Sequence, residues 1–221
     1  MHVVLPPRRL RAVYRRLFAR YGPQHWWPAH TPFEVIVGAV LTQNTAWTNV
    51  ERAITNLDQA GALTPAALLA LAPDELARLL QPSGYFNVKA RRLRAVCGWY
   101  LEQGEYSRLR RWSTQRLRDE LLELHGVGPE TADDILLYAF DRPVFVIDAY
   151  TRRVFVRLGV IAGDEPYEVL RAGFEQVLGP DAALFNEYHA LIVRHAKANC
   201  RPRPSCTDCC LRRLCPAAVS P

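Results

Sequence analysis

The sequence predicts an all-α fold with a metal-binding tail, and three observations support this fold class. Apolar residues recur at helical spacing along most of the 221 residues. Strand-like patterning marks the segment 142–150 (RPVFVIDAY), which is short and lies between two predicted helices, so we interpret it as an extended connection. Five of the six cysteines lie within residues 200–215, and such a tight cluster indicates a metal site rather than a disulfide framework.

The helical pattern predicts a succession of helices joined by short connections. The first helix is basic and amphipathic, with Leu10, Val13 and Leu17 on one face. Two later helices begin at Pro65 and Pro73, because the first helical turn tolerates proline. The predicted helices span residues 8–20, 33–43, 46–60, 65–71, 73–80, 87–103, 114–124, 130–140, 149–158, 166–178 and 181–198.

The composition is that of an ordinary globular protein with an excess of basic residues. The net charge of +6 and the pI near 9.2 favour a polyanionic partner, although many basic proteins bind no nucleic acid. The longest apolar run, 35–41, is far shorter than the about 20 residues that span a bilayer. Residues 1–33 contain six arginines and no acid, as a transit peptide does, but a basic amphipathic helix is the better interpretation. We expect a monomer in the cytoplasm, associated with the nucleoid.

The cysteine cluster has a spacing that suits an iron–sulfur centre. Cys200, Cys206, Cys209 and Cys215 form the pattern C-x5-C-x2-C-x5-C. Soft thiolate ligands select zinc or iron–sulfur clusters. Zinc sites usually pair two C-x2-C units across a longer loop, so the single C-x2-C favours a [4Fe-4S] cluster over zinc or over free structural thiols. Cys210 could replace Cys209 as a ligand, but the spacing favours Cys209.

A turn with two glycines separates two predicted helices in the stretch ELHGVGPETADDILLYAF, residues 123–140. Gly126 and Gly128 allow the backbone to approach a ligand closely, and the N–H groups at the next helix start can bind a phosphate. Such a turn is also common as a plain helix connection. Asp148 follows at the end of the next apolar run, just before another predicted helix.

Taken together, these motifs resemble the helix-hairpin-helix base-excision DNA glycosylases of the endonuclease III superfamily. The matching stretches cover nearly the whole chain: LTQNTAWTNV (41–50), PSGYFNVKARRL (82–93), HGVGPETAD (125–133), VIDAYTRRV (146–154) and the tail cysteines. The resemblance implies two helical domains with a base pocket between them. A six-helix barrel with the hairpin would take 31–142, and 1–30 would pack with 143–221, which carries the [4Fe-4S] cluster.

The resemblance also assigns roles in binding double-stranded DNA. The backbone of Gly126, Val127 and Gly128 is expected to hold a phosphate, so these residues count as DNA-binding. Gln43 resembles the residue that fills the gap left by a flipped base, although a cap or surface amide is the commoner role of glutamine. Arg152 and Arg153 begin a helix and are expected to meet phosphate, with exposed charge as the alternative.

Two acidic residues are the catalytic candidates. Asp148 matches the family's catalytic aspartate. Glu130 stands where bifunctional members place the lysine that attacks the sugar and cleaves the strand through a Schiff base. A carboxylate cannot form an imine, and the neighbouring Pro129 offers no substitute. The sequence therefore predicts a monofunctional glycosylase without efficient AP-lyase activity, in which Glu130 would favour a cationic base.

A second set of residues resembles the 3-methyladenine glycosylase branch of this superfamily. The candidate pocket residues are Trp26, Trp27, Trp47, Tyr150 and Lys197. Tryptophans and tyrosines of this kind are often plain core anchors, and the best-known members of that branch lack the cysteine tail. The leading hypothesis is removal of alkylated bases by base flipping. The alternatives are an endonuclease III-like glycosylase for oxidised or mismatched pyrimidines and a non-catalytic lesion-binding iron–sulfur protein.

Overall fold

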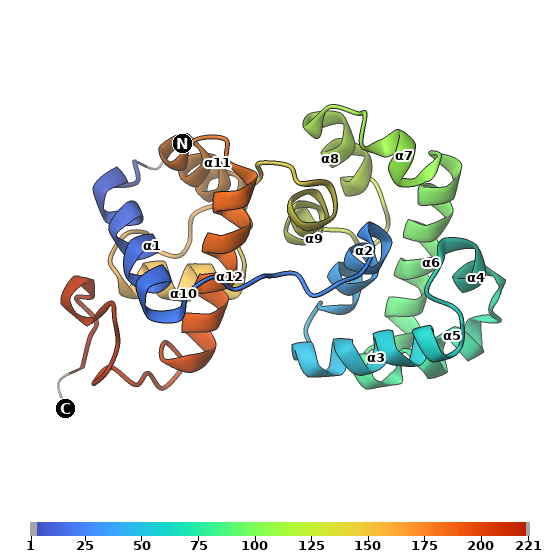
Figure 1. Cartoon of the computed structure of the whole chain (residues 1–221), viewed down its shortest axis with the longest axis horizontal. Helices are drawn as coiled ribbons and strands as arrows, with labels where there is room; N and C mark the ends of the chain where they lie inside the picture. Colours follow the sequence, from blue (N-terminus) through green and yellow to red (C-terminus); the bar gives the residue numbers. More distant parts are fainter. Residues whose placement is uncertain (1–3, 220–221) are drawn as a thin grey trace. The chain divides into compact units, whose positions relative to one another are not determined.

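The computed structural model describes residues 4–219, and within that range every regular element is a helix (Figure 1). The chain divides into two compact units. The central unit is residues 27–142, and the terminal unit joins residues 1–26 to residues 143–221. None of the described helices is long and apolar enough to cross a membrane.

The central unit is built around a short helix that is apolar except for Glu34. Its helices are α2 (Pro32–Leu41), α3 (Trp47–Gln59), α4 (Pro65–Ala70), α5 (Pro73–Leu79), α6 (Phe86–Glu102), α7 (Glu105–Leu109), α8 (Thr114–Leu122) and α9 (Pro129–Asp134). All residues of α2 from Phe33 to Leu41 are buried. This helix packs against α3, α6 and the 135–139 segment that continues α9, so the run that looked most hydrophobic in the sequence is the core of the unit.

The terminal unit packs α1 (Pro7–Tyr21) and α10 (Ala149–Arg157) against α12 (Ala182–Ala198), with α11 (Tyr167–Leu178) beside α1. Its core is aromatic. Phe145 stacks on Phe174 with ring centroids 4.5 Å apart, and Phe155 and Tyr188 surround this pair. The Tyr188 hydroxyl is fully buried and donates a 2.8 Å hydrogen bond to the Leu10 carbonyl, which ties α12 to α1.

Capping residues account for where many helices begin. The helix starts predicted at Pro65 and Pro73 are confirmed. A side-chain oxygen accepts a hydrogen bond from the helix's first turn at five N-caps, namely Thr31, Thr64, Ser113, Asp148 and Asp181. One of these caps, Asp148, is also a candidate catalytic residue.

Two features differ from the predicted helices. The five-residue helix α7 was not predicted, because it is too short to display a period. The helix predicted over 130–140 is α-helical only to Asp134, and Ile135–Ala139 form a π-helical turn. The extended connection predicted at 142–150 is confirmed up to Asp148, where α10 takes over.

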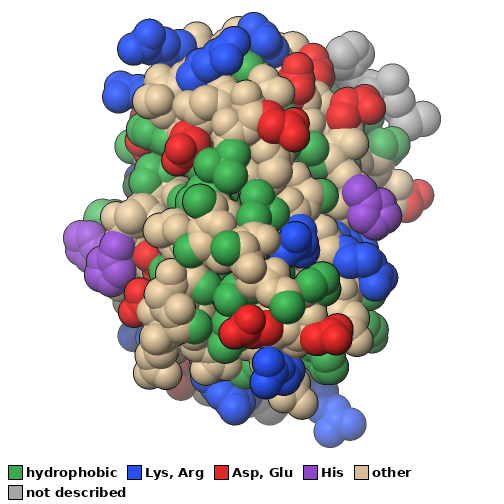
Figure 2. Space-filling view, turned by 90° about the vertical axis from the view of Figure 1, so that its right-hand side faces the viewer, with side chains coloured by type: hydrophobic (Ala, Val, Ile, Leu, Met, Phe, Trp, Pro, Cys, Tyr) green, Lys and Arg blue, Asp and Glu red, His purple; other side chains and the backbone are tan. Residues whose placement is uncertain are grey.

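The basic residues are spread unevenly over the surface. Figure 2 shows one face, on which arginine and lysine side chains gather at the upper end while acidic and basic groups alternate elsewhere. On this face the largest group of basic side chains lies at one end (Figure 2).

Candidate functional site

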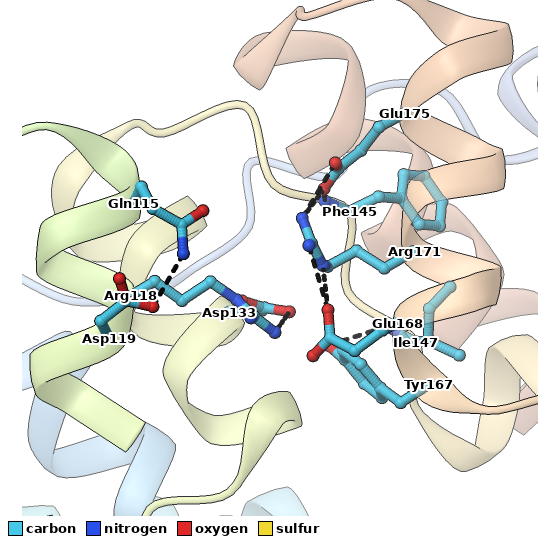
Figure 3. A network of polar contacts seen from close by, with 10 residues as sticks. All are labelled: Gln115, Arg118, Asp119, Asp133, Phe145, Ile147, Tyr167, Glu168, Arg171 and Glu175. Carbon is cyan, nitrogen blue, oxygen red and sulfur yellow. Dashed lines mark hydrogen bonds and ion pairs between the residues drawn. The ribbon is translucent and has the colours of Figure 1, made fainter. Parts of the chain in front are cut away.

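Asp148 lies at the junction of the extended connection and α10, and the backbone around it is held in place. The Oε1 atom of Glu175 accepts a 3.0 Å hydrogen bond from the backbone N–H of Phe145, three residues before Asp148. Arg171 keeps the Glu175 carboxylate in position through an ion pair of 2.9 Å (Figure 3). The segment leading to Asp148 is thus anchored to α11 although it belongs to no helix or strand.

The Asp148 carboxylate is buried and makes two polar contacts. Its Oδ1 accepts a 2.6 Å hydrogen bond from the Thr151 N–H, and its Oδ2 lies 3.5 Å from Nε2 of His189 on α12. Burial by itself raises the pKa of Asp148, but the charge and hydrogen bonding of His189 and the Thr151 amide outweigh it and hold the pKa below its usual range. Asp148 is therefore an ionised carboxylate at neutral pH.

Two of the predicted pocket residues, Tyr150 and Lys197, lie close to each other. The Lys197 ammonium on α12 lies 5.7 Å from the ring centroid of Tyr150, and the Arg153 guanidinium lies 5.1 Å from the same ring. Both distances are within cation–π range. The structure thus brings Lys197 close to Tyr150, which lies two residues after Asp148 in the chain.

The two arginines predicted to bind DNA are anchored within the terminal unit. Arg153 donates to the backbone carbonyls of Cys200 at 2.8 Å and Ala196 at 3.3 Å, and Arg152 donates to the Glu165 carbonyl at 2.9 Å. A phosphate would have to share these guanidinium groups with the carbonyls. Their contacts establish a structural role, and the DNA-binding role stays a prediction.

An aromatic cluster forms in the central unit. Trp27 packs edge-to-face on Trp47 with centroids 5.0 Å apart, and on Tyr138 at 5.1 Å. Gly38 on α2 leaves room for the Trp27 indole, since a Cβ there would lie 2.9 Å from the ring. Trp26, the preceding residue, belongs to the terminal unit.

Tyr138 was missed in the sequence analysis. It lies in the π-helical turn that follows α9, and its aromatic type was the only signal that could have singled it out. A π-turn widens the helix and shifts the direction of the side chains that follow. Helical periodicity therefore could not place Tyr138 beside Trp27.

The hairpin between α8 and α9 has the geometry that its glycines require. Gly126 has a φ of +86°, which favours glycine, and Gly128 caps α9. The Val127 side chain is buried and its N–H donates to the Leu124 carbonyl at 3.0 Å. The first-turn N–H groups of α9 have no partner within the helix, so they and the glycine amides are the donors suited to a phosphate. Glu130 lies exposed in that first turn.

A buried ion pair holds the two hairpin helices together. The Arg118 guanidinium on α8 contacts the Asp133 carboxylate on α9 with two hydrogen bonds, of 2.7 and 3.2 Å (Figure 3). Both side chains are almost completely buried. Such a bidentate pair fixes the relative orientation of the helices. Removing one partner alone leaves the other as an unpaired buried charge.

The Gln43 side chain contacts the hairpin, and its role in DNA binding stays a prediction. It follows the end of α2, and its Nε2 donates to the Gly126 carbonyl and to the Thr131 hydroxyl, each at 3.0 Å. Its Oε1 accepts a hydrogen bond from Nη1 of Arg92 on α6. The structure therefore brings together Gln43 and the glycine turn, which lie far apart in the sequence.

Lys89 is a further residue that the sequence analysis did not single out. Its ammonium is buried and donates to the carbonyls of Leu41 at 2.8 Å and Ser83 at 2.7 Å. Burial, together with the charge of Arg92, lowers the pKa of Lys89 to about 8. Lys89 thereby joins the end of α2 to the turn before α6. The sequence does not indicate that Lys89 is buried, because a lysine on a predicted helix is usually exposed to solvent.

The two hairpin glycines make a matched pair for mutation. We expect Gly126→Ala to lower the free energy of unfolding by about 2–4 kcal/mol, because it adds left-handed strain and puts a Cβ 2.4 Å from Arg92 side-chain atoms. Gly128→Ala should cost less than about 1 kcal/mol, since φ is −94° and a Cβ meets nothing within 4 Å. Urea unfolding of both variants measures the difference, and equal losses would contradict the geometry.

The tail cysteines surround one hollow. Cys200, Cys206, Cys209 and Cys215 line one small hollow, whereas Cys210 is not among its lining residues. The Cys200 Sγ accepts from an Arg157 N–H at 3.3 Å, and the Cys215 thiol donates to the Arg157 carbonyl at 3.2 Å. The Cys209 Sγ lies 3.7 Å from Nε2 of His195.

The four tail thiols influence one another electrostatically. Burial raises the pKa of the Cys209 thiol, and the three other candidate ligands raise it further, because four thiolates in one place repel. Over residues 4–219 no group of three or more histidine, cysteine or acidic side chains is placed so that it could hold a metal ion. Four cysteines placed around a hollow are what a cubane requires, since it is held by four separate thiolates.

Comparison with known proteins agrees with this geometry. Residues 37–180 match the family model described as "HhH-GPD superfamily base excision DNA repair protein". The Methanocaldococcus jannaschii protein named "Putative DNA repair glycosylase MJ1434" is 47% identical over 206 residues, covering 92% of this chain and 94% of that one. Endonuclease III of Thermotoga maritima is 30% identical over 185 residues, covering 83% and 82%.

One solved structure is similar in both sequence and fold. It is the H. pylori 3-methyladenine DNA glycosylase MagIII bound to 1,N6-ethenoadenine, with 29% identity, a TM-score of 0.72, and coverage of 86% of this chain and 95% of that one. The family model spans well over half of the chain and includes the hairpin, Asp148 and the aromatic residues Trp47 and Tyr138. The chain belongs to the HhH-GPD superfamily of base excision DNA repair proteins.

Proposed function

We propose that this protein is a monofunctional DNA N-glycosylase that removes alkylated bases of the 3-methyladenine type from double-stranded DNA. The observation that carries the proposal is the aromatic cluster of Trp27, Trp47 and Tyr138. Aromatic faces attract cations, and 3-methyladenine in DNA is a cationic π-system. The similarity to MagIII, a 3-methyladenine glycosylase, supports the same substrate class.

A cationic base is already a good leaving group and needs little protonation by the enzyme. Asp148 is therefore the main catalytic residue in this proposal. As the glycosidic bond breaks, its electron pair passes to the base, which leaves as a neutral molecule, and the sugar becomes oxocarbenium-like. The ionised, buried carboxylate of Asp148 stabilises this positive charge. Water then adds to C1′ and passes its proton to Asp148, which acts as the general base.

The DNA duplex would be held by the hairpin and by Gln43. The amides of Gly126 and Gly128 and of the first turn of α9 offer donors to a backbone phosphate. Gln43 would fill the space that the flipped nucleotide leaves. Tyr85 is a further candidate contact: it is 72% exposed and shares an open hollow with Gln43, so its ring is available to stack on a base.

Glu130 separates this reaction from that of a lyase. We expect the wild-type protein to yield no covalent DNA adduct with borohydride, because no lysine occupies position 130 and a carboxylate cannot form an imine. Glu130→Lys places an amine at an exposed first-turn position and should create a trappable adduct. Gel electrophoresis after borohydride treatment measures both. An adduct with the wild-type protein, or no adduct with Glu130→Lys, would contradict this role of position 130.

We further propose that Cys200, Cys206, Cys209 and Cys215 hold a [4Fe-4S] cluster. The shared hollow and the mutual influence of the thiols support this assignment, as does the similarity to endonuclease III. The cluster would act structurally, by cross-linking a tail in which the described residues after α12 form one short 3₁₀ turn, Arg212–Leu214. Arg157 would stabilise it by offsetting thiolate charge at Cys200.

A second candidate is an endonuclease III-like glycosylase for oxidised or mismatched pyrimidines, favoured by the cysteine tail and the 30% identity to endonuclease III. Purified protein should be tested on duplexes that carry 3-methyladenine, thymine glycol or a uracil mismatch, with the free base and strand breaks measured separately. Release of 3-methyladenine without strand cleavage supports our proposal. Release of thymine glycol alone supports the second candidate, and binding without any release indicates a non-catalytic protein.

A further inference from the structure

Arg92 has no role in the function described above, yet it joins the two parts that would meet DNA. It lies one helical turn after Lys89 on α6, and its Nη1 donates to the Oε1 of Gln43. Its aliphatic chain lies directly against Gly126, where a Cβ would come within 2.4 Å of Cγ, Cδ and Nε. Arg92 therefore contacts both Gln43 and the glycine turn at Gly126.

The Gln43 amide is fully engaged by these neighbours. Its two N–H donors go to Gly126 and Thr131, and its oxygen accepts from the charged Arg92. Gln43 cannot offer the same atoms to a base pair until these hydrogen bonds break. The bond from Arg92 is charge-assisted, which makes it the strongest of the three.

The surroundings leave Gln43 room to move. Open space of about 640 Å³ adjoins it, lined by Gln43, Asn44, Tyr85, Val88, Lys89 and Arg92. The Nε of Arg92 is buried, and among the described residues it has no hydrogen-bond partner. A guanidinium with a spare donor beside the glycine turn is poorly satisfied in the free protein.

We propose that Arg92 is a positioning residue that stores Gln43 against the hairpin until DNA is bound. Insertion of Gln43 into the duplex then requires its hydrogen bonds to Arg92, Gly126 and Thr131 to be exchanged for contacts with DNA. Because Gly126 is part of the turn that would hold phosphate, occupation of the turn and release of Gln43 are coupled. This inference rests on the proposed functions of Gln43 and of the hairpin.

Arg92→Met tests the inference, because it removes the hydrogen bond to Gln43 and keeps an unbranched chain against Gly126. Insertion is followed by stopped-flow fluorescence of 2-aminopurine placed opposite a tetrahydrofuran abasic analogue. We expect insertion to become about tenfold faster, since one charge-assisted bond no longer has to break. Arg91→Met is the matched control: Arg91 is the exposed neighbour, and its loss changes the net charge equally.

A double-mutant cycle shows whether Arg92 acts through Gln43. In a Gln43→Ala background, Arg92→Met should leave the fluorescence kinetics unchanged. With Gln43 present, Arg92→Lys should keep insertion slow in part, because a lysine can still donate to the Gln43 oxygen. An equal effect of Arg92→Met with and without Gln43 would mean that Arg92 acts on DNA directly. That result overturns the proposal, as does no effect, or slower insertion, in the wild-type background.

The abasic analogue separates this test from the proposed base specificity. No base is excised from the probe, so an error about 3-methyladenine leaves the fluorescence result unaffected. If Gln43→Ala alone leaves the signal unchanged, Gln43 does not fill the gap, and both its proposed role and the inference about Arg92 fail. Thermal unfolding of Arg92→Met and Arg92→Lys checks that both variants are folded.

Discussion

Asp148→Asn should lower the rate of base release by about 10²–10⁴-fold while binding to damaged DNA is retained. Asparagine is as good an N-cap as aspartate, so it can still accept the 2.6 Å hydrogen bond from Thr151 and preserve the start of α10. What it removes is the negative charge and the proton-accepting oxygen. Single-turnover excision and a gel-shift titration measure the two quantities.

The pH dependence of wild-type activity and stability provides a second test of Asp148. Its pKa is lowered from 3.8 in the folded protein, so Asp148 stays ionised as the pH falls from 7 to 4, and its protonation should not limit activity there. Its contribution to stability is complete above the unfolded value and is lost as the pH falls through the lowered folded value. Unchanged turnover in Asp148→Asn would remove this residue from the mechanism.

Cys209→Ser and Cys210→Ser should behave very differently although the residues are adjacent. Cys209 lines the hollow with the other three candidate ligands, and Cys210 does not. We expect Cys209→Ser to lose the absorbance near ~400 nm that is typical of iron–sulfur thiolates and to be destabilised by about 4 kcal/mol or more. Cys210→Ser should retain both colour and stability.

Iron and sulfide analysis and thermal unfolding of the two purified variants decide this prediction. Burial raises the pKa of the Cys210 thiol to about 11 and also raises the pKa of Cys209, so the distinction between the two rests on which of them lines the hollow. A wild-type preparation that is colourless and contains zinc would contradict the cluster. If Cys210→Ser rather than Cys209→Ser loses the iron, the assigned ligand set is wrong.

The sequence was informative where one local rule decides the outcome. Helical periodicity placed α1 and α6 within a residue or two of the predicted ends, and the proline rule placed the starts of α4 and α5. Asp148 was identified through a resemblance, and the structure adds the reason for its ionisation, namely His189 and the Thr151 amide.

The residues that were missed owe their importance to contacts between distant segments. Arg92 and Lys89 looked like solvated charges on a helix, yet they hold Gln43 and the end of α2. Tyr138, which contacts Trp27, lies in the π-turn that follows α9. Such contacts depend on tertiary packing, which has no period in the sequence.

The central claim, a preference for cationic alkylated bases, is tested most directly by a single-turnover competition. Two duplexes of identical sequence, one carrying 3-methyladenine and the other thymine glycol, are labelled with different fluorophores and mixed with excess enzyme. The aromatic cluster and Glu130 predict that the methylated base is released much faster, with intact abasic strands as the product. Faster release of thymine glycol, or strand cleavage at the same rate as base release, would contradict the account.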